Sequence, residues 1–475
     1  MPEFGVHTSH VRGSPELPAP RKRETSRHSA DDFPPIRLTS TSAQCCLDHD
    51  LRVDAHYTAG GMIELGLSRV ARLLQQTPLT WKAIHIAGTN GKGSISAYLS
   101  HLLSASDVRC GRFTSPHLID RWDCITIGER VVQESLFRQI ESQVKQRDQK
   151  LGIGASEFEL LTATAFEIFN HEQVEVGVVE VGMGGRLDAT NVLSDVLVSV
   201  IAKIGMDHQA FLGSTIEEIA REKGGILKPG VPCVIDNTNE TAVLETLSSR
   251  IQELGIEAMF VSPDKADEQL PPLAQLFRKL DLEPHQQENM CSAVSALRLA
   301  LAKIRPEADA FSLLPHLSDV KWPGRLESIN LQPLIERAEP VLLDGAHNPQ
   351  SAAVLGRYID RKLRPTSENV TWVIAASSGK DLAGVFCSII RPGDNVATAE
   401  FGPVDGMPWV TPTNATELAS TVRSISEIGQ VESFEGDLLP AIQWASKVAQ
   451  GGPIVIAGSL YLVSDVHRLL RDARQ

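Results

Sequence analysis

A glycine-rich stretch early in the chain carries the residue types of a phosphate-binding loop. The mostly apolar run 84–87 leads into three glycines, a lysine and a serine, at Gly88, Gly91, Lys92, Gly93 and Ser94. Glycines let backbone N–H groups turn toward an anion, and a helix that starts there adds a favourable dipole. Lys92 can reach a terminal phosphate, and Ser94 stands where a hydroxyl directed at Mg²⁺ belongs. These residues predict a site for a nucleoside triphosphate.

The spacing within this loop differs from the common P-loop pattern. That pattern places four residues between its glycines and a Ser or Thr directly after the lysine. Here only two residues separate the first two glycines, and Gly93 stands between Lys92 and Ser94. An ordinary glycine-rich turn is the structural alternative. The order of strand, glycines, lysine, hydroxyl and helix favours a phosphate site.

Two later strands end in side chains that could bind a metal ion. The run 174–181 is apolar almost throughout and has Glu180 at its end, and the run 196–201 is followed by His208. Such continuous apolar strands indicate a parallel sheet covered on both faces. Ligands of open α/β sheets bind at the carboxyl ends of the strands, so both side chains are expected beside the phosphate loop, as is the loop Thr114–His117. A lone Glu or His is otherwise more often structural.

Alternating strands and helices must position these residues, which predicts an α/β protein. The apolar spacing over 63–74 predicts an amphipathic helix before the first strand. Ser214 or Thr215 is expected to cap a helix that Gly224 ends. Further strands are predicted at 231–235, 258–261, 341–343, 370–375, 395–399 and 453–457, and further helices near 95–103, 240–254, 285–301, 350–363, 380–390, 415–426, 437–449 and 460–473.

The alternation is interrupted near 322–326 and restarts at 340, which predicts two α/β domains. Residues 1–50 are polar, rich in Pro, Ser, Thr and His, and are expected to be disordered. The predicted organisation is this extension over 1–50, a nucleotide-binding domain over 51–325 and a smaller α/β domain over 326–475. Asn348 and Pro349 should open the first helix of the second domain.

Composition narrows the possible function classes. The chain of 475 residues has a formal net charge of -14 and seven cysteines without metal-like spacing. The negative charge argues against a broad nucleic-acid surface, and no apolar run is long enough to cross a bilayer. Cysteine usage is typical of a reducing compartment. A monomeric, cytoplasmic protein acting on small molecules is expected. Acidic residues near the start argue against the alternative, a mitochondrial transit peptide.

Five motifs occur in the order seen in folylpolyglutamate synthases and dihydrofolate synthases of the Mur ligase superfamily. They are Ala87–Ser94, Thr114–His117, Gly182–Asn191, Glu222–Ile226 and Asp344–Pro349. The sequence resembles this family over about residues 60–465, and the family's own spacing explains the unusual P-loop. The resemblance implies an α/β fold with a P-loop central domain of the Mur ligase type and a smaller Rossmann-like C-terminal domain.

The resemblance also implies an ATP-driven amide ligase that works through an acyl phosphate. The γ-phosphoryl group would pass to a pterin carboxylate, and the amine of L-glutamate would then displace phosphate. The ATP contacts carried over from the family are Gly91, Lys92, Gly93, Ser94, Asn289, Arg325 and Asp344. The residues assigned to catalysis are Lys92, Lys223, His208 and Arg325.

Metal and substrate contacts are implied in the same way. One Mg²⁺ would be held by Ser115 and Glu180, and a second by His208. Lys223 resembles the family's carbamoylated lysine, in which CO₂ turns the amine into a carboxylate-like metal ligand. The pterin-side residues are Phe158 and Asp188, and the glutamate-side residues are His347 and Ser459. The reaction brings anions together, so metals and lysines must offset charge, and a closing second domain would exclude water.

The sequence departs from the family pattern at two positions outside the five motifs. Gly379 stands before Lys380-Asp381 where an aspartate is usual, and Lys203 occupies a position that is commonly small or polar. Other function classes fit less well. A nucleotide-dependent switch would not need the set from Glu180 to Lys223, and a cell-wall Mur ligase should carry a further N-terminal nucleotide-sugar domain, for which residues 1–50 are too short.

The choice of pterin substrate depends on a short loop. After Thr114–His117 the chain carries Trp122-Asp123, where polyglutamate-extending eukaryotic enzymes typically carry a Glu-Arg doublet. Fungal dihydrofolate synthases resemble this chain there and in the opening Glu64–Arg69. The resemblance therefore favours addition of the first glutamate, to dihydropteroate. A folylpolyglutamate synthase, or one enzyme that does both, is the alternative.

Overall fold

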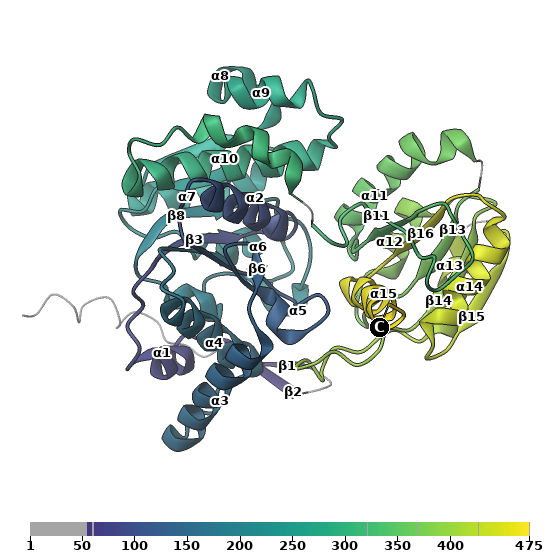
Figure 1. Ribbon diagram of the computed structural model, residues 1–475, viewed down its shortest axis with the longest axis horizontal. Coiled ribbons are helices and arrows are strands. Elements are labelled where there is room, and N and C mark those ends of the chain that lie inside the picture. Colours follow the sequence, from purple (N-terminus) through teal and green to yellow (C-terminus); the bar gives the residue numbers. More distant parts are fainter. Residues whose placement is uncertain (1–54, 59–60, 321, 368, 426, 475) are drawn as a thin grey trace, which may run out of the picture. The chain divides into compact units, whose positions relative to one another are not determined.

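The structure is a computed structural model that describes residues 55–58, 61–320, 322–367, 369–425 and 427–474, all within one compact unit. The extension predicted to be disordered, 1–50, lies outside these residues. Across the described residues the strands form an antiparallel pair and two larger sheets (Figure 1). The pair joins β1 (Ala55–Thr58) to β2 (Gly61–Glu64).

The first large sheet carries the phosphate loop. Its strand order is β10-β9-β8-β3-β7-β4-β5-β6, and neighbours are parallel from β10 to β4 and antiparallel from β4 to β6. The strands are β3 (Lys82–Ala87), β4 (Cys110–Phe113), β5 (Ile125–Ile127), β6 (Arg130–Val131), β7 (Val176–Glu180), β8 (Val196–Ile201), β9 (Cys233–Asp236) and β10 (Ala258–Val261). The parallel centre places the carboxyl ends of β3, β7 and β8 side by side.

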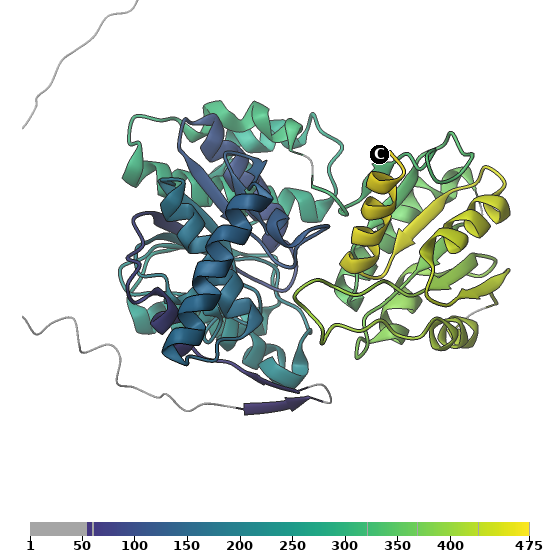
Figure 2. The ribbon, with the colours of Figure 1, turned by 60° about the horizontal axis from the view of Figure 1, so that its bottom comes forward.

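Helices cover both faces of this sheet, as the apolar strands predict. Neighbouring residues on β7 point to opposite faces: Val178 packs in the core formed with α2 and α10, and Val179 packs in the core formed with α1, α3 and α4. Figure 1 labels these layers, and Figure 2 brings the blue α3 and α4 layer to the front. The helices are α1 (Ser68–Leu74), α2 (Lys92–Ala105), α3 (Glu134–Leu151), α4 (Glu157–His171), α5 (Gln209–Leu212), α6 (Ile216–Gly224), α7 (Thr241–Leu254), α8 (Ala266–Gln269), α9 (Pro271–Phe277) and α10 (Pro284–Ile304).

The second large sheet has the strand order β11-β12-β16-β13-β14-β15, parallel except for β11. Its strands are β11 (Glu327–Ile329), β12 (Val341–Asp344), β13 (Thr371–Ile374), β14 (Asn395–Ala399), β15 (Val431–Phe434) and β16 (Ile454–Ala457). One core holds α11 (Pro349–Lys362), α12 (Leu382–Ile389) and α13 (Ala415–Ile425), and the other holds α14 (Leu438–Ala449) and α15 (Leu460–Asp472). The predicted division after residue 325 stays a prediction.

Two helix starts follow the predicted capping residues. Thr215 caps α6, because its hydroxyl accepts from the Glu218 backbone N–H at 3.3 Å while the Glu218 carboxylate accepts from the Thr215 N–H at 3.1 Å. Asn348 caps α11 by accepting from the Ser351 N–H at 2.9 Å, and Pro349 opens the helix. Both confirm that local side-chain chemistry sets these boundaries.

Several element predictions were wrong or incomplete. The helix expected over 63–74 starts only at Ser68, since Ile63 lies in β2. The strands β4, β5, β6, β11 and β15 were not predicted. They have two to four residues each, too few to show a period, and β15 has two adjacent polar residues and lies at an edge of its sheet. Pairing to neighbours, which sequence does not display, creates these strands.

Asp394 holds one end of the second sheet together. Its carboxylate is fully buried and accepts from both terminal nitrogens of Arg364, at 2.9 and 2.8 Å. It also accepts from Trp372 Nε1 at 3.0 Å and from the backbone N–H groups of Val370 at 2.9 Å and Arg391 at 3.0 Å. One carboxylate therefore satisfies donors from β13, from the residue before it, from the 3₁₀ turn at Arg364 and from the loop after α12.

We predict that Asp394→Ala lowers the free energy of unfolding by about 3–5 kcal/mol, because it removes the buried acceptor of two Arg364 N–H groups and of three other N–H donors. Urea unfolding followed by circular dichroism measures this change. The matched control is Asp267→Ala, which removes an exposed ion pair with Arg278 and should cost no more than about 1 kcal/mol. Equal effects of the two substitutions would contradict the role given to Asp394.

Candidate active site

The phosphate loop brings backbone and side chains unusually close together. Gly91 has φ +90° and precedes the first residue of α2, Lys92. A Cβ built on Gly91 would lie 2.3 Å from Asn289 Oδ1, and one on Gly93 would lie 3.0 Å from the Trp322 ring. Among the described residues no side chain caps the N-terminus of α2. The glycines therefore fit both the turn and its neighbours, and the first N–H groups of α2 stay available for an anion.

Lys92, Glu180 and Arg325 form one charged group at this sheet edge. Lys92 Nζ lies 3.7 Å from Glu180 Oε1 and donates to the Thr89 carbonyl at 3.3 Å. Burial raises the pKa of Glu180, and the charges of Lys92 and Arg325 oppose that rise. The backbone N–H of Ser115 also faces the Glu180 carboxylate, which places the predicted loop at this edge. Glu180 and the loop of Ser115 therefore lie at the edge of the phosphate loop, and the roles assigned to these residues stay predictions.

Lys223 is the second lysine of the site, and it is buried. It sits in the last turn of α6, and its Nζ donates to the Gly88 carbonyl at 3.0 Å. Burial, and secondly the charge of Lys92, lowers the pKa of Lys223 to about 7. An amine with such a pKa is largely neutral above pH 7. Although α6 carries several charged residues, this lysine is buried.

His208 lies on the loop after β8, next to a charged network. It has φ +52° and is solvent-exposed, and it precedes α5. Its neighbour Asp207 accepts from Lys380 Nζ at 2.6 Å and lies 3.7 Å from His347 Nε2. His208 and Glu180 share no group of three His, Cys, Asp or Glu ligands within 4.8 Å in the described chain. The assignment of metal ions to Glu180 and to His208 stays a prediction.

Arg325 and the predicted second-sheet residues surround the end of β12. Asp344 is buried there and accepts from the Leu326 N–H at 2.7 Å and the Ala346 N–H at 2.9 Å. Burial raises the pKa of Asp344, and Arg325 opposes that rise. His347 lies three residues further on, with Nδ1 2.8 Å from the Gly345 carbonyl. Asp344 thus shapes the loop that holds His347.

Three predicted residues have structural partners that the sequence did not indicate. Asp188 is buried, and its carboxylate accepts from the Thr190 hydroxyl at 2.5 Å and from the Met183 N–H at 2.8 Å. Phe158 stacks on Phe113 with ring centroids 6.3 Å apart. The Asp188 hydrogen bonds hold the loop 182–191, and Phe158 packs against Gly182 at its start.

Ser459 is the third of these residues. It is buried, and its hydroxyl caps α15 by accepting from the Tyr461 N–H at 3.1 Å. A capping role accounts for a serine at this position, so its assignment to glutamate stays a prediction.

The sequence missed the residues that link the two sheets here. Besides the Lys380–Asp207 pair, Asn90 Nδ2 donates to Gln350 Oε1 at 2.5 Å, and Asn348 Nδ2 donates to Asn90 Oδ1 at 3.3 Å. The sequence singled out Lys380 only because Gly379 precedes it where an aspartate is usual. No local pattern pairs residues that are 173 or 260 positions apart. The other unusual residue, Lys203, donates to the Thr238 carbonyl and hydroxyl, which anchors it in the first sheet.

Comparison with known proteins gives consistent results along the chain. Residues 86–302 match the Mur ligase middle domain, and residues 327–470 match the dihydrofolate synthetase C-terminal domain. The chain is 37% identical to a probable dihydrofolate synthetase of Schizosaccharomyces pombe, covering 86% of this chain and 99% of that protein. The chain belongs to the dihydrofolate synthase and folylpolyglutamate synthase family.

Further relatives agree with this family membership. The dihydrofolate synthetase of Saccharomyces cerevisiae is 35% identical, covering 86% of this chain and 98% of that one. A crystal structure of a bifunctional folylpolyglutamate synthase/dihydrofolate synthase with Mn, AMPPNP and L-glutamate bound has a TM-score of 0.69 and 25% identity, covering 86% of this chain and 95% of that one. Family membership makes the protein an ATP-dependent ligase and confirms the predicted Mur-ligase-type fold.

We predict that Gly91→Ala reduces ligase activity by about 10²-fold, because a Cβ would displace Asn289 or the loop by about an ångström. ATP affinity from calorimetry and initial ligation rates measure the change. Gly128→Ala is the matched control, since Gly128 also has positive φ, +53°, but a Cβ there meets no atom within 4 Å. Normal ATP binding by a folded Gly91→Ala variant would contradict the phosphate-site assignment.

Proposed function

We propose that the protein adds L-glutamate to dihydropteroate, with ATP, to form dihydrofolate. The observation that carries this proposal is the 35–37% identity to two fungal dihydrofolate synthetases over nearly their whole length. The alternative is extension of the glutamate chain on reduced folates, alone or by the same enzyme. One enzyme with both activities is part of this alternative because a structural relative is named as a bifunctional folylpolyglutamate synthase/dihydrofolate synthase.

The first step would transfer the γ-phosphoryl group of ATP to the dihydropteroate carboxylate. Two anions must approach each other, so cationic groups have to offset their repulsion. Lys92 at the start of α2 and Arg325 beside Glu180 and Asp344 are placed for this, and Gly91, Gly93 and Ser94 would bind phosphates through the helix N-terminus. Asn289, against Gly91, would contact the nucleotide.

Glu180 and Ser115 fit a Mg²⁺ ion. Magnesium prefers oxygen ligands and is commonly bound by one or two carboxylates together with substrate phosphates. Glu180 supplies a buried carboxylate at the sheet edge, and Ser115 supplies a hydroxyl from the facing loop. Bound there, the ion would offset charge on the phosphates. We assign a second ion to His208 and a carbamate on Lys223.

The second step would be attack of the glutamate amine on the acyl phosphate, forming the amide and releasing phosphate. His347 and Ser459, on the loops after β12 and β16, are our candidates for binding glutamate. Phe158, and Asp188 through the loop that it holds, would bind the pterin. Because water would hydrolyse the acyl phosphate, contacts such as Lys380–Asp207, which join the two sheets, would help to exclude it.

The loop that favours dihydropteroate has a structural explanation. The Asp123 carboxylate accepts three backbone N–H groups, from Leu118 at 2.8 Å, Ile119 at 2.6 Å and Asp120 at 2.9 Å. Trp122 packs near Phe137 at 6.4 Å between ring centroids. Trp122-Asp123 therefore sets the shape of the loop that follows Ser115. We infer that any effect on substrate choice acts through this shape.

The experiment offers dihydropteroate and tetrahydrofolate separately to the purified protein with ATP, Mg²⁺ and labelled L-glutamate. We expect glutamate incorporation with dihydropteroate, one phosphate released per glutamate added. Hydroxylamine in place of glutamate should trap the acyl phosphate as a hydroxamate. Efficient addition to tetrahydrofolate and none to dihydropteroate would make the alternative correct, and ATP hydrolysis without glutamate transfer would exclude a ligase.

Lys223 is predicted to carry a carbamate. Carbamoylation needs a neutral amine, and burial near Lys92 favours that form. Intact mass should show the addition of one CO₂, and ¹³CO₂ should give a carbamate signal in the NMR spectrum of the protein. Lys223→Ala should lose both and about 10²-fold or more of the activity, with partial rescue by a small carboxylic acid.

The control for carbamoylation is Lys228→Ala. The pKa of Lys228 is also lowered by burial, to about 8, but its amine donates to Asn191 Oδ1 at 2.8 Å. If the carbamate signal disappears in Lys228→Ala and persists in Lys223→Ala, the assignment to Lys223 is wrong.

Two broader sequence-based predictions stay predictions. We propose a monomer and a cytoplasmic location, with the mitochondrion as the alternative. Across the described residues, helices are either too short or too polar to cross a membrane.

A further inference from the structure

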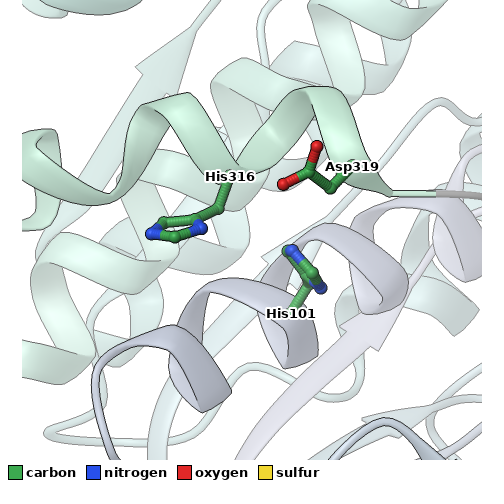
Figure 3. A group of neighbouring side chains, drawn as sticks. All are labelled: His101, His316 and Asp319. Carbon is green, nitrogen blue, oxygen red and sulfur yellow. The ribbon is translucent and has the colours of Figure 1, made fainter.

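A second group of metal-ligating side chains lies outside the active site. His101, His316 and Asp319 bring one ligand atom each within 4.8 Å of the others, the one such group of three among the described residues (Figure 3). The two imidazole rings have centroids 6.3 Å apart. Figure 3 shows a ring nitrogen of His101 directed toward the space between His316 and Asp319. Two imidazoles and a carboxylate are a common ligand set for Zn²⁺.

The local structure explains why these side chains converge. His316 and Asp319 belong to the 3₁₀ helix η4 (Ala310–Asp319) and are three residues apart. Residues i and i+3 of a 3₁₀ helix lie directly above one another, so the two side chains share one edge of η4. Leu314 and Leu317 have the same spacing and are buried, which anchors η4 on the core shared with α2. His101 is on the adjacent part of α2.

A fourth side chain supports the site. Glu129, in the turn between β5 and β6, has Oε2 3.6 Å from His101 Nδ1. A histidine that binds a metal through one ring nitrogen usually directs the other toward a carboxylate or carbonyl, which fixes its orientation. Glu129 is positioned to do this for His101, leaving Nε2 for the metal.

We propose that His101, His316 and Asp319 bind a divalent transition-metal ion, with Zn²⁺ as the ion used to test the site. Glu129 would orient His101, and water would complete the coordination shell. In a tetrahedral Zn²⁺ site the ligand atoms lie about 3.3 Å apart, given Zn–N distances of about 2.0–2.1 Å. The ligand atoms lie within 4.8 Å of one another, so they need to approach by at most about 1.5 Å, which side-chain rotation can supply because His316 and Asp319 are exposed.

The position of the site gives it a structural consequence. The ion would join η4 to the helix that begins with the phosphate loop. Three residues beyond Asp319, Trp322 lies against Gly93 and under the Arg112 guanidinium, which is 4.8 Å from its ring. Arg325 follows three residues later. A bound ion would therefore hold the segment that leads to Trp322 and Arg325 against α2.

The test adds Zn²⁺ alone, and Co²⁺ alone as a spectroscopic probe, to the metal-free full-length protein. We expect the wild type to bind one more Zn²⁺ than the double variant His101→Ala, His316→Ala, and to give a Co²⁺ absorption band that the variant lacks. Zn²⁺ should raise the Tm of the wild type and not that of the variant. Glu129→Gln should weaken Zn²⁺ binding by about 10–100-fold, because Glu129 only orients His101. Asp319→Asn should weaken Zn²⁺ binding more, because it removes a ligand.

Controls separate this site from other metal-binding positions. His171→Ala removes an exposed histidine elsewhere, and His208→Ala removes the predicted active-site ligand; both should keep the extra Zn²⁺. The double variant should keep the wild-type circular dichroism and its Mg²⁺-supported ligation rate. Equal Zn²⁺ stoichiometry and affinity in the wild type and the folded double variant would overturn the proposal, as would loss of the same ion in His208→Ala.

Discussion

Two lysines close together at one edge of a parallel sheet set the main physical constraint on this protein. Lys92 is the first residue of α2, and Lys223 lies in the last turn of α6. Both amines donate to backbone carbonyls of the phosphate loop, at Thr89 and Gly88. Their mutual repulsion, added to burial, favours a neutral Lys223. A bound anion would relieve this repulsion, and the parallel strands β3 and β7 bring the phosphate loop and Glu180 to one edge of the sheet.

The second sheet contributes to the same electrostatic balance. Lys380 pairs with Asp207 at 2.6 Å, and the charges of Asp344 and Glu180 oppose the lowering of the Arg325 pKa that burial causes. Separating the Lys380–Asp207 pair costs more free energy than separating an exposed ion pair, because both side chains are largely buried.

Buried carboxylates in this chain serve two different purposes. Glu180 has few backbone donors and lies beside cations, which is typical of a site that holds a ligand. Asp394, Asp188 and Asp123 instead accept several N–H groups each and shape the loops around them. A carboxylate whose lone pairs are all engaged is a poor metal ligand, so the hydrogen-bond partners distinguish the two groups better than burial does.

The sequence by itself determined β3, β7 and β8 and the helix starts beside them, since apolar runs, caps at Thr215 and Asn348, and the glycines at 88, 91 and 93 act over a few residues. It also carried enough motifs to indicate the family. Only the tertiary structure decided that Lys223 is buried, that Asp188 and Ser459 are engaged locally, and that Asp207 meets Lys380. It alone brought His101 to His316 and Asp319, because contacts between residues hundreds of positions apart depend on packing, which leaves no local pattern in the chain.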